Sequence, residues 1–524
     1  MKQHDLLLIH PPRNFMYVDR NAKKRSMFVM MPMGLIGLAD LADREGFSSR
    51  IINYSLERAL DKKYSLLRHL KGMEFGAVGV DLHWIVHSAG AIDTLRLIKQ
   101  HFPNTFTVLG GFSATYYARE IMRDHEFVDA IIQGDGELPL VRLLQQLKKG
   151  RDTLRDVPNL IYRHDGHVVD NTITYVAREI DSLNFARLKF MEHWKEYVAL
   201  CDKIMHFPFA IEMARGCPYN CIFCAGSRAS LKHICKRDDV LFRSPRRVVD
   251  DIKELVDTTG TNGVFYGHGV YPGTEQYFME VSKIIREERL EIHADLEVWR
   301  LPVSDAFMQD FSRTYQKDRS ILWFSNRCFS SRYRKKIDGL VGKHDSAFRF
   351  TDADFWHFID QAKRHDVIVE LFWDTGYPFE NAIDSMRNIG KAMQVTMRLI
   401  QRKDKVALWS EPIFISPGSI VERFSDKFGV KVKVKTFKDH LAFNRASPMR
   451  LPPFDTRTDY ETTTMPRVAA DIMNKLMLPI NFISFFPAIL VLMSQKKANT
   501  SRPGLAHPET RQDPTLHEMS KDHS

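Results

Sequence analysis

Apolar runs alternate with amphipathic stretches along the first 180 residues of the chain. The runs have the length and composition of buried strands and lie at 5–12, 50–54, 75–84, 105–111 and 129–137. Segments 33–47 and 89–102 have the spacing of helices. Strands that alternate with helices form a parallel sheet. We therefore expect an α/β domain over residues 1–180, with a doubly wound parallel sheet.

The same alternation returns after residue 200. Segment 244–260 begins with Ser244 and Pro245, a helix-start signal, and its apolar residues follow one helical face. Six apolar runs are separated by helical stretches, at 209–213, 263–269, 292–299, 321–329, 367–378 and 406–414. Such repetition predicts a partial (βα)6 barrel of the TIM type over residues 200–420.

Beyond residue 420 the patterns are weaker. Segment 427–437 alternates like a strand with one charged face, and 451–466 has the composition of a loop. Residues 476–493 are an apolar run that is just long enough to span a bilayer, although each of its two prolines removes a helical hydrogen bond. Three interpretations of this run remain open: a membrane span, a membrane-surface or lipid-facing segment, and an ordinary buried cap. We assign 421–494 to a small C-terminal substrate or cap region and 495–524 to a disordered tail.

The composition is that of a soluble globular protein. Hydrophobic residues make up 44% and charged residues 27% of the 524 residues. Six cysteines, none in the first 200 residues, do not form a disulfide framework. The first apolar run is too short for a signal peptide, so we expect a cytoplasmic protein. The net charge of +10 comes from basic residues spread along the chain, and we expect no nucleic-acid partner.

Three of the six cysteines lie close together, in the segment ARGCPYNCIFCAG. Cys217, Cys221 and Cys224 could be core thiols or part of a metal site. A structural zinc ion usually takes four Cys or His ligands, so a fourth would have to come from elsewhere. On a four-iron cluster, three cysteines leave one iron without a protein ligand, and a small molecule can bind there.

The spacing C-x-x-x-C-x-x-C, with Phe223 before the last cysteine and an apolar strand before the loop, resembles the radical S-adenosylmethionine superfamily. The resemblance implies a 4Fe-4S cluster on the three cysteines, S-adenosylmethionine at the open iron, and an electron donor such as flavodoxin or ferredoxin. In parallel barrels the chemistry lies at the carboxyl ends of the strands. The candidates for contacts with S-adenosylmethionine or substrate are therefore Phe223, Gly267, Ser325, Arg327 and Asp374. The Gly-Gly-Glu element of the family is not recognisable in residues 265–273.

The N-terminal sheet also has candidate ligand-binding residues at the carboxyl ends of its strands. They are Leu82, His83, Trp84, Gly110, Gly111, Gly134, Asp135, Gly136 and Glu137. The segments LGGFSAT and QGDGELPLVRLL, placed before such a barrel, resemble the cobalamin-binding domain of the cobalamin-dependent branch of the superfamily. The resemblance implies bound cobalamin. The element D-x-H-x-x-G is absent after the first strand, where IHPPRNF stands, so His83 is our candidate for the lower cobalt ligand. The alternative is a flavodoxin-like domain that binds no corrin.

Together these resemblances imply an enzyme that methylates an unactivated carbon of a small-molecule or lipid-like substrate. In the superfamily, one S-adenosylmethionine yields a 5'-deoxyadenosyl radical, and methylcobalamin supplies the methyl group. Cyclases and rearrangement enzymes belong to the same branch, and a cobalamin sensor or carrier is a non-enzymatic alternative. Methylthiotransferases have three further cysteines in their first domain, which this chain lacks.

Overall fold

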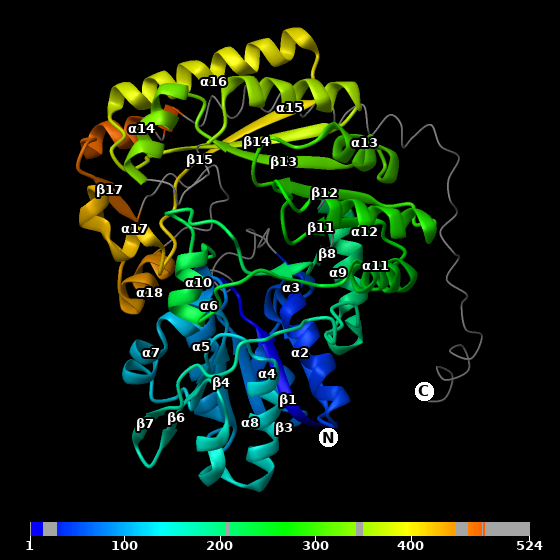
Figure 1. The fold of residues 1–524 in the computed structure, drawn as a ribbon. Helices are drawn as coiled ribbons and strands as arrows, with labels where there is room; N and C mark the ends of the chain where they lie inside the picture. The colour runs from blue at the N-terminus through cyan, green and yellow to red at the C-terminus, as the bar shows by residue number, and fades with distance from the viewer. Residues whose placement is uncertain are drawn as a thin grey trace, which may run out of the picture.

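The first sheet contains seven strands in the order β2-β1-β3-β4-β5-β6-β7 (Figure 1). It belongs to a computed structural model that describes residues 2–13, 29–204, 209–341, 349–446, 459–473 and 475–476. The strands are β1 (Lys2–His10), β2 (Ser49–Asn53), β3 (Met73–Asp81), β4 (Phe106–Gly110), β5 (Ala130–Ile132), β6 (Leu160–His164) and β7 (His167–Asp170). β1 to β5 pair in parallel, which confirms the predicted α/β sheet, whereas β6 and β7 form an antiparallel extension that the sequence patterns did not predict.

Helices cover both faces of this sheet because successive side chains of a strand point to opposite faces. Leu6 and Leu8 of β1 belong to the core cluster that includes α2 (Met33–Arg44) and α8 (Glu137–Lys149). Leu7 and Ile9 belong to the cluster that includes α5 (Ser88–His101). The other helices of this domain are α3 (Tyr54–Leu60), α4 (Leu66–Leu70), α6 (Phe112–Tyr116) and α7 (Ala118–Asp124). The predicted doubly wound arrangement is confirmed.

The barrel contains six parallel strands in sequential order, and β8 and β15 are its two edges. The strands are β8 (Phe209–Ile211), β11 (Gly263–Tyr266), β12 (His293–Val298), β13 (Ile321–Arg327), β14 (Ile368–Thr375) and β15 (Val406–Pro412). The helices are α11 (Pro245–Thr259), α12 (Glu275–Glu287), α13 (Asp305–Thr314), α14 (Ser331–Val341), α15 (Asp352–Arg364) and α16 (Ala382–Arg402). All six predicted strands are found, and Ser244 caps α11 by accepting a hydrogen bond from the amide of Arg247.

Shorter elements connect the two sheets and follow the barrel. They are α9 (Trp194–Ile204), β9 (Ala214–Arg215), α10 (Arg228–Cys235), β10 (Leu241–Phe242), α17 (Ile420–Arg423), β16 (Val430–Val432), α18 (Phe437–Ala446) and β17 (Tyr460–Thr462). The strand predicted at 427–437 is limited to β16, and β17 lies in the segment predicted as a loop. The apolar run 476–493 lies outside the described residues except for Leu476, as does the tail 495–524. In the part of the chain that is described, no helix has the length and apolar character needed to cross a membrane.

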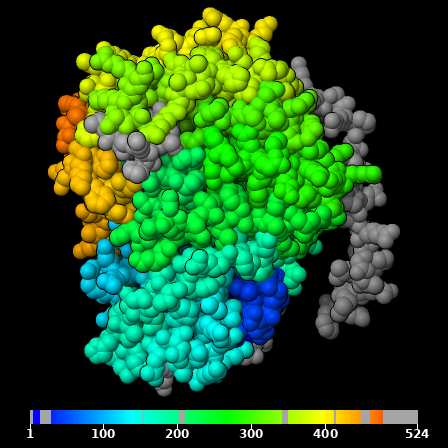
Figure 2. Space-filling view, viewed as in Figure 1, coloured from blue at the N-terminus to red at the C-terminus, as the bar shows by residue number. Residues whose placement is uncertain are grey.

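The two sheets share one hydrophobic core. Leu6 of β1, Ile36 of α2 and Phe209 of β8 belong to the same cluster of buried side chains. The chain then returns from the barrel to the first domain, because Phe437 and Leu441 of α18 are buried in the cluster around α5. In the space-filling view the two parts form one continuous surface (Figure 2).

Candidate cofactor site

The three cysteines lie in the loop after β9, near the carboxyl end of the first barrel strand. The loop starts at Gly216, whose φ is +99°, and a Cβ there would lie 2.1 Å from the carbonyl oxygen of Asp239. Only glycine fits such a backbone position. The other end of the loop is held by the segment after β15: the amide of Val421 donates to the carbonyl of Ile222 at 2.9 Å, and that of Ser416 to the carbonyl of Phe223 at 3.2 Å.

The three thiols are not grouped closely enough for a single tetrahedral metal ion in the described part of the chain. A tetrahedral zinc ion would require sulfurs about 3.8 Å apart. Among the described residues, no group of three potential ligands with all ligand atoms within 4.8 Å contains the cysteines. Burial raises the pKa of Cys217 to about 12, and the neighbouring Cys221 and Cys224 add to this effect. The thiols therefore need positive charge nearby to ionise.

Arg300 supplies part of that charge. Its Nη2 atom donates a hydrogen bond of 3.0 Å to the Cys221 sulfur, and its guanidinium lies 4.2 Å from the centre of the Tyr219 ring. Sequence reasoning missed Arg300, because it lies 79 residues from Cys221 in the chain and only the barrel brings the two together.

The ends of β13 and β14 bring together two of the predicted residues. The Nη1 atom of Arg327 donates to Asp374 at 2.9 Å, and the Tyr377 hydroxyl lies 2.9 Å from the same carboxylate oxygen. Burial opposes the charge of Arg327, but Asp374, helped by Tyr377 and Cys221, raises its pKa. The ring of Phe223 lies 5.6 Å from that of Tyr377. Tyr377 therefore contacts both the Arg327–Asp374 pair and Phe223 of the cysteine loop.

The other two predicted barrel residues occupy separate positions. Gly267 follows β11, and its amide donates to the carbonyl of Ile211 at 2.9 Å. Ser325 is half-buried on β13, where the register with β14 shifts. The sequence patterns missed Glu297 on β12, a carboxylate whose pKa is raised by burial and which accepts a 2.6 Å hydrogen bond from the Trp299 indole. A glutamate within the apolar run 292–299 was the available signal.

The switch point of the first sheet, where sheets of this kind have their ligand crevice, lies between β1 and β3. The strand order β2-β1-β3-β4-β5 reverses direction at this point, and ligands of such sheets bind at the carboxyl ends of the strands there. The structure brings together the turns after β3 and β4, since the amide of Ser113 donates to the carbonyl of His83 and the amide of Leu82 donates to that of Gly110. Gly111 has a φ of +104°, and a Cβ there would lie 2.7 Å from the amide nitrogen of His83. Leu82 is fully buried, whereas His83 and Trp84 are exposed.

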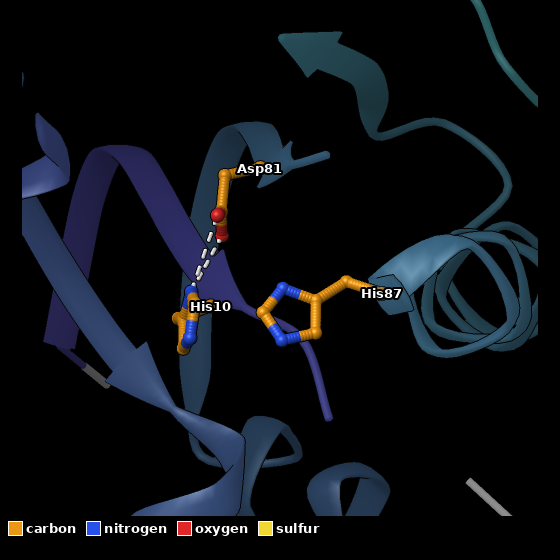
Figure 3. Close-up of side chains that lie close together, drawn as sticks. All are labelled: His10, Asp81 and His87. Carbon is orange, nitrogen blue, oxygen red and sulfur yellow. Dashed lines mark hydrogen bonds and ion pairs between the residues drawn. The ribbon is translucent and has the colours of Figure 1, made fainter. Parts of the chain in front are cut away.

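Two histidines and an aspartate lie close together at this switch point (Figure 3). His10 ends β1, Asp81 ends β3, and His87 lies immediately before α5. The His10 Nδ1 atom is 2.9 Å and 3.2 Å from the two Asp81 oxygens, and the two histidine rings are 5.1 Å apart. Burial alone would lower the pKa of His10, but Asp81 raises it above the ordinary value, whereas burial lowers that of His87 to about 3. The sequence patterns missed this group; a histidine within the first apolar run, 5–12, was its one signal.

The turn from Gly134 to Glu137 contacts the cysteine loop of the barrel. Arg215, two residues before Cys217, lies 2.6 Å from a Glu137 oxygen and 3.4 Å from an Asp135 oxygen. Asp135 is also 2.7 Å from Arg237. The carboxylates predicted to bind a ligand thus hold the base of the cysteine loop.

Comparisons with known proteins bear on both domains. A family model described as the B12 binding domain matches residues 25–144. Hopanoid C-3 methylase of Methylococcus capsulatus is 24% identical over 271 residues, which are 51% of this chain and 47% of that protein. An anaerobic magnesium-protoporphyrin IX monomethyl ester cyclase of Cereibacter sphaeroides is 29% identical over 177 residues, 32% of this chain and 26% of that protein. In both cases the match spans less than half of the relative.

A solved structure has the same fold. The radical S-adenosylmethionine methyltransferase TsrM from Kitasatospora setae, with cobalamin and a 4Fe-4S cluster bound, superposes with a TM-score of 0.60 at 14% identity, over 84% of this chain and 81% of that one. These matches support the resemblance to the cobalamin-dependent branch of the radical S-adenosylmethionine superfamily.

The donor set fits the cofactors of that superfamily. Three free thiols in one loop, with an arginine at the sulfur of Cys221, suit an iron-sulfur cluster. The glycine at position 111 leaves room for close packing of the turns after β3 and β4. In the first sheet, His10, Asp81 and His87 lie at the switch point itself, beside the predicted His83.

Proposed function

We propose that the chain is a cobalamin-dependent radical S-adenosylmethionine methyltransferase that acts on an unactivated carbon of a small-molecule or lipid-like substrate. The observation that supports this most directly is the contact between the two cofactor regions. Arg215 bonds to Glu137 and Asp135 of the first domain and lies two residues from the first cysteine of the loop. A lipid-like substrate is supported by the similarity to hopanoid C-3 methylase.

The residues have separate roles in this proposal. Cys217, Cys221 and Cys224 hold the 4Fe-4S cluster, and the Arg300 guanidinium stabilises the charge on the Cys221 sulfur. Arg327 and Asp374, fixed by Tyr377, offer a cation and a carboxylate to the carboxylate and amino groups of S-adenosylmethionine. The turns at Leu82–Trp84, Gly110–Gly111 and Gly134–Glu137 hold cobalamin. When bound, the cluster would supply an electron, S-adenosylmethionine a hydrogen-abstracting radical, and cobalamin a methyl group. A cytoplasmic flavodoxin or ferredoxin is the proposed electron donor.

The test uses the full chain, reconstituted without oxygen with iron, sulfide and cobalamin. It is incubated with reductant, S-adenosylmethionine carrying a deuterated methyl group, and lipid and aqueous fractions of cells that lack the protein. We expect 5'-deoxyadenosine and S-adenosylhomocysteine in roughly equal amounts, with a product that carries the deuterated methyl group. No 5'-deoxyadenosine from any fraction, with cluster and cobalamin bound, would indicate a sensor or carrier.

A cyclase or rearrangement enzyme is the second candidate, since one relative is a magnesium-protoporphyrin IX monomethyl ester cyclase. The same experiment separates the two. Product that forms with 5'-deoxyadenosine but without an added methyl group or S-adenosylhomocysteine would replace methylation by cyclisation.

Matched cysteine variants test the cluster assignment. Changing Cys217, Cys221 or Cys224 to alanine should each abolish the visible absorbance of the cluster, because each thiolate holds one iron. Cys235→Ala, in α10 of the same region, is the control and should keep full iron content. Full iron and activity in any of the first three variants would contradict the assignment.

A further inference from the structure

The longest helix of the barrel, α16, has an unusual exposed face. Ile383, Met386, Met393, Met397 and Ile400 are between 42% and 61% exposed. Their spacing of three, seven, four and three residues places them in one row along the helix. α16 runs along the outer edge of the barrel (Figure 1), and its atoms form the upper rim of the molecular surface in Figure 2. Single exposed apolar residues are ordinary, but a continuous row marks an interaction surface.

A row of cations lies beside the apolar row. Arg387, Lys391 and Arg398 are exposed on α16. The helix has one acidic residue, Asp384, which is buried and bonded to Lys336 at 2.9 Å. The exposed face of α16 is therefore apolar along one side, basic along the other and without negative charge. Such a division is typical of helices that lie in the interface of an anionic membrane.

A second apolar face starts at the same end of the barrel. The hydroxyl of Thr464 donates to the carbonyl of Glu380, directly before α16, at 2.7 Å. The helical residues that follow expose Val468, Ile472 and Leu476, which are four residues apart and 40% to 70% exposed. In the sequence this row leads directly into the apolar run 476–493.

We propose that α16, together with residues 467–473 and 475–476, forms a docking face for an anionic lipid surface. The charge pattern favours lipid over a second copy of the chain, because a symmetric contact between two α16 helices would bring the same basic rows close together. On a membrane the apolar row lies at the boundary between headgroups and acyl chains, and the cations reach anionic headgroups. This inference does not depend on the proposed chemistry.

The test measures cosedimentation of the full chain with two kinds of vesicle, phosphatidylcholine alone and phosphatidylcholine mixed with phosphatidylglycerol. Wild type should bind the mixed vesicles more tightly, and salt should weaken this binding. Arg387→Gln with Lys391→Gln should weaken it roughly tenfold or more, since each cation contributes about a fivefold factor. Met386→Gln, Met393→Gln and Met397→Gln together should weaken binding to both vesicles roughly tenfold to hundredfold.

Matched controls lie on the first domain. Lys62 and Lys63 are exposed, and Leu60 is 44% exposed; their changes to glutamine should leave vesicle binding unaltered. Far-ultraviolet circular dichroism checks that each variant folds. Binding that is absent in wild type, unchanged in the α16 variants, or lost only on removal of residues 477–524 would overturn the proposal. Concentration-dependent dimers that the methionine variant abolishes, without vesicle binding, would assign the face to a second copy instead.

Discussion

Glu380 shows how a single buried carboxylate supports the candidate site. Its Oε2 atom accepts hydrogen bonds from the amides of Gly376 and Tyr377, at 2.7 Å and 3.0 Å. The turn that it fixes carries Tyr377, which in turn contacts Asp374. The side chain is fully buried, and burial raises its pKa to about 7 in spite of these hydrogen bonds.

Glu380 should make the stability of the protein fall as pH rises. The folded state holds its proton up to about pH 7, whereas the unfolded chain loses it near the ordinary value of 4.5. The folded state therefore binds more protons between these two values, and the free energy of unfolding decreases by about 3 kcal/mol across the window. Glu380→Gln should remove this decrease. Denaturant unfolding at several pH values, compared between wild type and variant, measures the difference; equal slopes would contradict the assignment.

The residues of the site were predictable where their chemistry is local. The cysteines and Phe223 share one loop, so the sequence alone places them together. Arg300 and His10 acquire their partners only through the fold. The His10 contact with Asp81, for example, joins residues 71 positions apart, and no periodic pattern encodes such a pair.

Elements were predictable according to their length and burial. The six barrel strands and the five parallel strands of the first sheet are apolar runs buried on both faces, the strongest signal a strand can give. β16 and β17 have three residues each and pair across a long separation. The hairpin of β6 and β7 is only partly buried. Pairing between chain-distant segments defines β16 and β17, so the sequence patterns misjudged the first and missed the second. β6 and β7 instead pair locally across the turn at Asp165 and Gly166, a hairpin signal that the patterns missed.

The junction between β4 and α6 offers a test at the scale of elements. Gly111→Ala should destabilise the protein by about 2 kcal/mol or more, because φ is positive and the new Cβ would meet the backbone of the turn after β3. Gly110→Ala is the matched control: no heavy atom lies within 4 Å of its Cβ position, and we expect a change within about 0.5 kcal/mol. Denaturant unfolding measures both. Retention of cobalamin, followed by absorbance, should also fall in the Gly111 variant. Equal effects of the two changes would show that the turn does not require glycine.

At the scale of the whole molecule, both apolar and charged contacts join the two domains. One hydrophobic cluster includes side chains of β1 and β8. α18 returns to the first domain, where the Asn444 amide donates to the carbonyl of Ile85 at 2.8 Å. The charged contact is that of Arg215 with Glu137 and Asp135. Since Arg215 directly precedes the loop of the cysteines, this contact sets the position of the cluster site relative to the switch point of the first sheet.

Removing one carboxylate from that contact should therefore affect both stability and the cysteine loop. The Glu137 and Arg215 side chains are only 11% and 22% exposed, and Glu137→Gln leaves Arg215 with less compensation for its buried charge. We expect a loss of about 1–3 kcal/mol in the free energy of unfolding. Asp305→Asn breaks the pair with Arg364, whose side chains are 52% and 56% exposed, and should cost less than about 1 kcal/mol. The Glu137 variant should also lose iron from the reconstituted cluster faster on dilution into chelator, whereas the Asp305 variant should match wild type. Iron retention equal in all three proteins would show that the first domain does not support the loop.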